Sequence, residues 1–119
     1  MKNELRIGNL VTDKDGEVLE VFNILQSYVR VYIDNELEDL QLSYSDLKPI
    51  PLTEEWLLKF GFVKNSTSWT NWRRPNHTKE VRIGFVNKLN YYNGLEIKYV
   101  HQLQNLYFAL TGEELNVTK

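Results

Sequence analysis

The stretch Trp69–Pro75 has the residue types best suited to binding chemistry, because it places two tryptophans beside two arginines. A histidine and a lysine follow within a few residues. Aromatic side chains can stack on nucleic-acid bases, and cationic side chains can hold phosphates or carboxylates. The stretch therefore predicts a patch that binds nucleic acid or an acidic partner. The residues of this predicted patch are Trp72, Arg73, Arg74, His77 and Lys79.

The same stretch also has a structural interpretation. Side chains alternate between the two faces of a strand, so Trp69 and Trp72 point to opposite sides and at least one is expected in the core. Arg73 and Arg74 then form an exposed basic strand end. The sequence leaves open which tryptophan is buried and whether the arginines bind a partner.

A second candidate surface is the outer face of the predicted strand Tyr28–Ile33. Its odd-numbered residues are apolar and are expected to point inward, which leaves Tyr28, Arg30 and Tyr32 outward. Small SH3-like barrels often bind peptides or nucleic acid through such aromatic residues. That function is an analogy at the level of the fold.

Enzymatic chemistry has little support in the sequence. The only histidines are His77 and His101, and neither has the spacing of a metal or acid–base pair. The sequence has no cysteine, no phosphate-binding glycine loop and no nucleophile elbow. The adjacent acids Glu54 and Glu55 are expected to stabilise the start of a helix. We therefore expect no enzymatic activity, no metal and no cofactor.

The composition is that of an ordinary globular domain. The 119 residues are 42% hydrophobic and 25% charged, with a net charge of −2. This charge gives no global attraction to nucleic acid or to an anionic membrane. The amino-terminal residues lack the apolar core of a signal peptide, and no apolar run approaches the ~18 residues of a membrane span. We expect a cytoplasmic protein without a membrane partner.

Residues 1–51 are expected to form a small SH3-like β-barrel, because they contain five short strand patterns with a tight turn before the last. An open curved sheet with the same pairing is the alternative. Closure is favoured because it removes exposed strand edges. The predicted strands are Leu5–Val11, Glu17–Ile24, Tyr28–Ile33, Leu40–Tyr44 and Lys48–Ile50.

A short helix is predicted after the barrel, between Thr53 and Gly61. Pro49 and Pro51 keep the preceding segment extended. Thr53 is suited to cap the helix, and Gly61 is suited to the left-handed residue that ends it. The side chains expected in the core between the two halves are Trp56, Leu57 and Phe60.

Residues 52–119 are expected to form an α+β unit that packs on the barrel, with two helices on one face of an antiparallel sheet. Residues 87–90 and the pair Asn93–Gly94 are expected to form turns, and Gly112 is expected to end the final helix. The predicted strands are Phe62–Lys64, Ser68–Arg74, Val81–Phe85 and Leu95–Tyr99, and the final helix is His101–Leu110.

Three stretches of the chain, Leu5–Val11, Ile50–Phe62 and Tyr99–Leu115, read LRIGNLV, IPLTEEWLLKFGF and YVHQLQNLYFALTGEEL. They resemble a family of small uncharacterised proteins that are encoded by phages, prophages and mobile elements of Bacteroides-type gut bacteria. Residues 63–78 have no counterpart in this resemblance. The resemblance implies a cytoplasmic accessory protein of a mobile element, and it implies no functional residues.

Two functions are consistent with these patterns. The first is a non-enzymatic interaction module that binds a protein partner or a second copy of itself. The alternative is a nucleic-acid-binding accessory protein that uses the patch around Trp72, with or without the tyrosines of Tyr28–Ile33. Binding to nucleic acid should weaken steeply with salt, whereas binding through an apolar protein interface should not.

Overall fold

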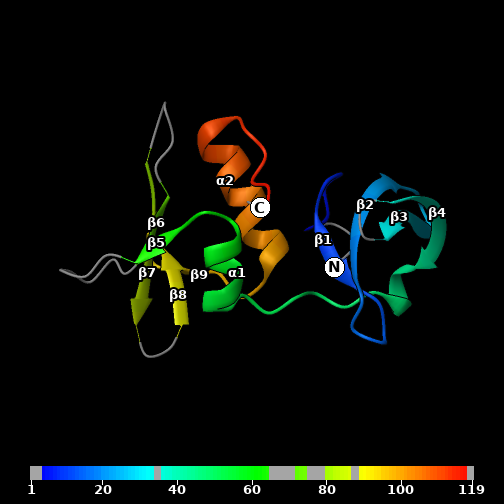
Figure 1. Cartoon of the computed structure of the whole chain (residues 1–119), viewed down its shortest axis with the longest axis horizontal. Coiled ribbons are helices and arrows are strands. Elements are labelled where there is room, and N and C mark those ends of the chain that lie inside the picture. The colour runs from blue at the N-terminus through cyan, green and yellow to red at the C-terminus, as the bar shows by residue number, and fades with distance from the viewer. Residues whose placement is uncertain (1–3, 34–35, 65–71, 75–79, 87–88, 118–119) are drawn as a thin grey trace. The chain divides into compact units, whose positions relative to one another are not determined.

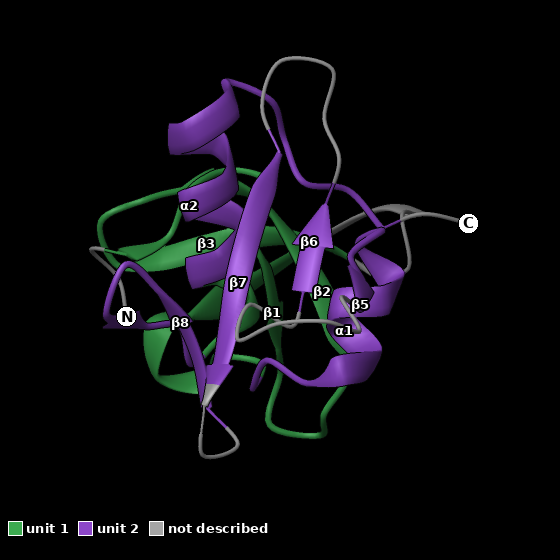
Figure 2. Ribbon diagram, turned by 90° about the vertical axis from the view of Figure 1, so that its left-hand side faces the viewer, with its two compact units in different colours: residues 1–50, 99–101 green, residues 51–98, 102–119 purple. Residues whose placement is uncertain are grey.

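The computed structural model describes residues 4–33, 36–64, 72–74, 80–86 and 89–117. The chain divides into two compact units (Figure 2). Unit 1 contains residues 1–50 and 99–101, and unit 2 contains residues 51–98 and 102–119. Each unit contains an antiparallel sheet, and the described residues also form two α-helices, so the fold class is α+β.

Unit 1 is built on a four-stranded sheet in which strands that follow one another in sequence are neighbours (Figure 1). Its strands are β1 (Leu10–Thr12), β2 (Val18–Ile24), β3 (Tyr28–Ile33) and β4 (Glu36–Ser43). A 3-10 turn, η2 (Tyr44–Asp46), follows β4. Lys48 then pairs with Thr12, and the two residues exchange N–H···O bonds of 2.8 and 2.9 Å. The predicted fifth strand is therefore reduced to a single bridge.

The closed barrel that the sequence predicted is not confirmed. Among the described residues, no pairing joins β4 to β1 or to Lys48, so the sheet is open. The first strand was also predicted too long, because a turn occupies residues 6–9. In this turn the Arg6 N–H donates to Asn9 Oδ1 at 2.6 Å, the Asn9 N–H donates to the Arg6 carbonyl at 3.0 Å, and Gly8 has φ 99°. Gly8 and Asn9 still bond to β2, through Gly8 N–H to the Val21 carbonyl and Val21 N–H to the Asn9 carbonyl, but regular pairing with β2 begins only at Leu10.

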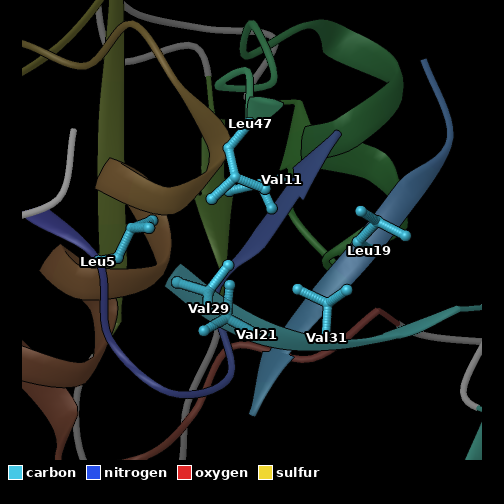
Figure 3. Close-up of a cluster of buried hydrophobic side chains, with 7 residues drawn as sticks. All are labelled: Leu5, Val11, Leu19, Val21, Val29, Val31 and Leu47. Atoms are coloured by element: carbon cyan, nitrogen blue, oxygen red, sulfur yellow. The ribbon is translucent and has the colours of Figure 1, made fainter. Parts of the chain in front are cut away.

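The core of unit 1 lies on one face of its sheet (Figure 3). Alternate residues of β2 and β3 contribute to it, and for β3 this is the period of two that the sequence predicted. Full burial of one aliphatic side chain contributes about 1.5–3 kcal/mol. The other face of β2 and β3 is therefore left to polar and aromatic side chains. The buried cluster comprises Leu5, Val11, Leu19, Val21, Val29, Val31 and Leu47.

Unit 2 is built on a five-stranded antiparallel sheet, also in sequence order. Figure 1 shows both helices on the same side of this sheet. Trp72, Val81 and Ile83 are buried on the sheet, and Ile97 is buried directly after its last strand. This helix-on-sheet layer agrees with the predicted α+β arrangement. The elements are α1 (Glu54–Lys59), β5 (Val63–Lys64), β6 (Trp72–Arg74), β7 (Val81–Val86), β8 (Leu89–Tyr92), β9 (Leu95–Glu96) and α2 (Val100–Thr111).

Helix α1 has the ends that its sequence predicted. Thr53 Oγ1 accepts a hydrogen bond from the Trp56 N–H at 3.3 Å, and Gly61 adopts φ 87°. Phe60 is buried, as is Leu57. Trp56 was predicted to be buried but is half-exposed, with its ring 5.7 Å from that of Phe60. The Lys59 ammonium lies 4.6 Å from the Trp56 ring and covers part of it.

Candidate functional site

The outer face of β2 and β3 in unit 1 carries the second set of residues that the sequence singled out. Val29 and Val31 are fully buried, so the intervening side chains project from the opposite face of the sheet. These side chains are Tyr28, Arg30 and Tyr32, and each is half-exposed.

Phe22 joins this surface through an irregularity in β2. Val21 pairs with Val31, but the next pair is Asn23 with Arg30, so Phe22 is the extra residue of a β-bulge. Its ring stacks on Tyr32 with a centroid distance of 4.1 Å and an angle of 15° between the rings. The Arg30 guanidinium carbon lies 5.6 Å from the Phe22 ring centroid.

We call this surface the aromatic face and define it by Glu20, Phe22, Tyr28, Arg30 and Tyr32. Glu20 lies on it because it pairs directly with Tyr32 and because its neighbours Leu19 and Val21 are buried. The ring stack contributes about 0.5–1.5 kcal/mol and the cation–π contact about 0.5–1 kcal/mol, so both contacts favour the observed positions of these side chains. The charges of Glu20 and Arg30 balance.

Sequence reasoning missed Phe22 because β2 is apolar on both faces. Its position two residues after Glu20 on a strand was the available signal, since both residues must share a face. The bulge could not be foreseen, because the residue types of β2 do not mark it.

Trp72, the tryptophan of the predicted nucleic-acid patch, is a buried residue of β6. Its side chain is 2% exposed and lies among the buried residues of the unit 2 sheet. A buried indole has no free face on which a base could stack. Trp69, which the sequence offered as the other core tryptophan, lies outside the described residues, as do His77 and Lys79.

Arg73 and Arg74 were predicted to form one basic strand end, but they leave β6 on opposite faces. Arg73 pairs across the strands with Arg82, and Glu80 lies between the two guanidinium groups. Glu80 Oε2 accepts from Arg82 Nε at 2.7 Å, and Glu80 Oε1 accepts from Arg73 Nη1 at 3.0 Å. Arg82 and then Arg73 hold the pKa of the Glu80 carboxyl below its usual range. One carboxylate therefore neutralises part of the charge predicted for the patch.

Arg74 points to the same face as Trp72 and connects three elements of unit 2. Its Nε donates to the Phe60 carbonyl at the end of α1, and its Nη1 donates to Tyr107 Oη of α2, both at 2.7 Å. The guanidinium also lies 5.1 Å from the Tyr107 ring centroid. These contacts give Arg74 a structural role in the core layer.

His101 is buried in unit 1, where its ring stacks on Tyr99 at 5.8 Å and 9°. Its Nε2 lies 3.5 Å from Glu4 Oε1. Burial lowers the pKa of His101, and the nearby Glu4 carboxylate partly opposes this effect. Within the described part of the chain, no group of three or more acidic, histidine or cysteine side chains is placed to hold a metal ion.

The structure thus brings Tyr28, Arg30 and Tyr32 together on one surface. It places Arg73 on the face of β6 opposite to Trp72 and Arg74. No helix among the described residues is long and apolar enough to cross a membrane. The chain matches no protein-family model, no curated protein and no solved structure.

Proposed function

We propose that the chain is a non-enzymatic interaction module that binds a protein partner through the aromatic face of unit 1. The stack of Phe22 on Tyr32, with Arg30 against Phe22, is the observation that carries the proposal. From the family resemblance, we further propose that it is a cytoplasmic accessory protein of a phage or mobile element.

The chemistry of the aromatic face supports a protein partner over a nucleic acid. Tyrosine, phenylalanine and arginine are enriched at protein interfaces, and tyrosine and arginine are frequent among their energetically dominant residues. The aromatic face has one cation, Arg30, and one anion, Glu20, so it offers a phosphate backbone no net attraction. Gln41 pairs with Arg30 and Ser43 pairs with Tyr28, which adds hydrogen-bonding groups beside the aromatic rings.

Nucleic-acid binding through the strand end of β6 has less support. Trp72 is buried, Arg74 is engaged by Phe60 and Tyr107, and Arg73 shares Glu80 with Arg82. A mobility shift with single-stranded and duplex DNA and RNA tests this alternative. Binding that falls steeply with salt and is lost in the double variant Arg73→Ala, Arg82→Ala would favour it over the protein partner.

An SH3-like architecture for unit 1 is part of the proposal. The order of β1 to β4, the 3-10 turn after β4 and the pairing of Lys48 with Thr12 support it.

Site-specific photocrosslinking in cells that carry the gene tests the protein-binding proposal. A photoreactive amino acid at Gln41, which is exposed beside Arg30, should form an adduct with a protein. The same amino acid at Lys14, in the exposed turn before β2, is the matched control and should form none. The Gln41 adduct should disappear when Tyr32→Ala is added. Equal protein adducts at both positions, or none at Gln41, would contradict the proposal.

A further inference from the structure

We propose that the aromatic face pairs with the same face of a second copy of this chain. This inference rests on the proposed function, because it names the occupant of that same surface. The self-complementary arrangement of charge on the face is the observation that leads to it.

The two charged residues of the face lie at opposite ends of the aromatic pair. Glu20 pairs across the strands with Tyr32, whereas Arg30 pairs with Asn23 beyond the bulge. The stacked rings of Phe22 and Tyr32 lie between these two positions. The face therefore has a negative end, an aromatic centre and a positive end.

A two-fold axis converts this order into a complementary contact. If the axis lies in the plane of the contact and crosses the line from Glu20 to Arg30 at the aromatic pair, each end meets its opposite. Glu20 of one copy then faces Arg30 of the other, and the reciprocal pair forms by symmetry. The Phe22 and Tyr32 rings of both copies meet at the centre, where water is excluded.

The two guanidinium–carboxylate pairs of such a contact would specify its orientation more than its strength. A pairing without reversal of the face would place Glu20 against Glu20 and Arg30 against Arg30, which like-charge repulsion disfavours. Stable interfaces use roughly 20–30 residues on each side, and the aromatic face is smaller. We therefore expect a weak dimer whose population depends on protein concentration.

Charge reversal with the full-length chain tests this pairing. In sedimentation velocity over concentrations from about 5 to about 500 μM, the range in which weak interfaces associate, the unmodified chain should shift from monomer toward dimer. Glu20→Arg alone should remain monomeric, because it places arginine against arginine. Arg30→Glu alone should remain monomeric, because it places glutamate against glutamate.

An equimolar mixture of the two single variants gives the decisive measurement. In the mixed pair, the introduced Arg at position 20 faces the introduced Glu at position 30, and the native Arg30 faces the native Glu20. The mixture should therefore dimerise to at least the extent of the unmodified chain. A general loss of folding cannot produce this rescue. The matched control is the pair Lys14→Glu and Asp15→Arg, two charge reversals in the exposed turn before β2 that should leave dimerisation unchanged.

Three results would overturn the inference. They are a chain that is monomeric at all concentrations, a dimer that survives both single reversals, and a mixture of the reversals that stays monomeric. If the chain is monomeric but Gln41 still crosslinks to a different protein in a Tyr32-dependent way, the proposed function stands and the self-pairing is wrong. If neither dimer nor adduct forms, both are wrong.

Discussion

The outer face of β3 and the strand β6 contain the same residue types but differ in which of them are buried. Both place aromatic side chains next to arginine. In β3 the buried positions belong to Val29 and Val31, so the tyrosines and Arg30 project outward. In β6 the buried position belongs to Trp72, and the strand alternation sends Arg74 to the same side. Whether an aromatic–arginine motif is a surface or a structural contact thus depends on which alternate residues occupy the core.

Truncation of the central aromatic residue in each region should show this difference most strongly. Trp72→Ala should lower the free energy of unfolding by about 3–5 kcal/mol, because it leaves a cavity in the core of unit 2. Tyr32→Ala should lower it by about 1 kcal/mol, since it mainly removes a ring contact on a half-exposed face. Urea unfolding followed by circular dichroism measures both. Equal losses would show that the two residues are equally structural.

The two neighbouring arginines of β6 provide a second, smaller test. Arg74→Ala should cost about 2–3 kcal/mol, because it removes the donors to the Phe60 carbonyl and to Tyr107 Oη in a partly buried site. Arg73→Ala should cost less than Arg74→Ala, because its ion pair with Glu80 is half-exposed and such pairs contribute little to stability. The same unfolding measurement applies. A larger loss for Arg73 than for Arg74 would contradict the assignment of faces.

The smallest expected effect on stability comes from the buried His101, whose charge changes with pH. Its pKa is lowered from 6.5, chiefly by burial, so the folded state binds the proton less readily than the unfolded state. The stability that this histidine contributes is therefore complete above pH 6.5 and is lost as the pH falls below that value. The urea midpoint of the unmodified chain should decrease on acidification more than that of His101→Gln.

The variant Glu4→Gln is the control for this pH dependence. The Glu4 carboxylate favours the protonated histidine, so its removal should make the loss of stability on acidification steeper. A midpoint that does not depend on pH, or that rises on acidification in the unmodified chain but not in His101→Gln, would show that His101 is not held neutral.

Residue patterns predicted the parts of the fold that depend on local chemistry. The period of two in Tyr28–Ile33, the cap at Thr53 and the glycine that ends each helix each depend on a few adjacent residues, and each is present in the structure. The turn Asn93–Gly94 is also as expected, with both residues at positive φ. Such features follow from steric and hydrogen-bonding preferences that act over one or two turns of chain.

Features that depend on contacts between distant segments could not be predicted in the same way. Strand β8 includes Leu89 and Asn90, which were expected in a turn, because pairing with β7 and β9 outweighs the low strand preference of asparagine. Closure of the barrel was inferred from the number of strands and from the exposed edges that closure would remove, and the described pairings leave the sheet open. The burial of Trp72 could not be predicted, because alternation gives relative faces and does not say which face is buried.

The membership of residues 99–101 in unit 1 has a consequence for how the protein is made. The Val100 N–H donates to the Ile50 carbonyl at 2.8 Å, and His101 meets Glu4. During synthesis, the ribosome must produce residues 51–98 before this last piece of unit 1 exists. Residues 1–50 therefore cannot form their contacts with residues 99–101 until residues 51–98, which are most of unit 2, have been synthesised. In a protein whose domains are continuous in sequence, the first domain can fold before the second is synthesised. Unit 1 is discontinuous in sequence, so its folding cannot be completed in this order.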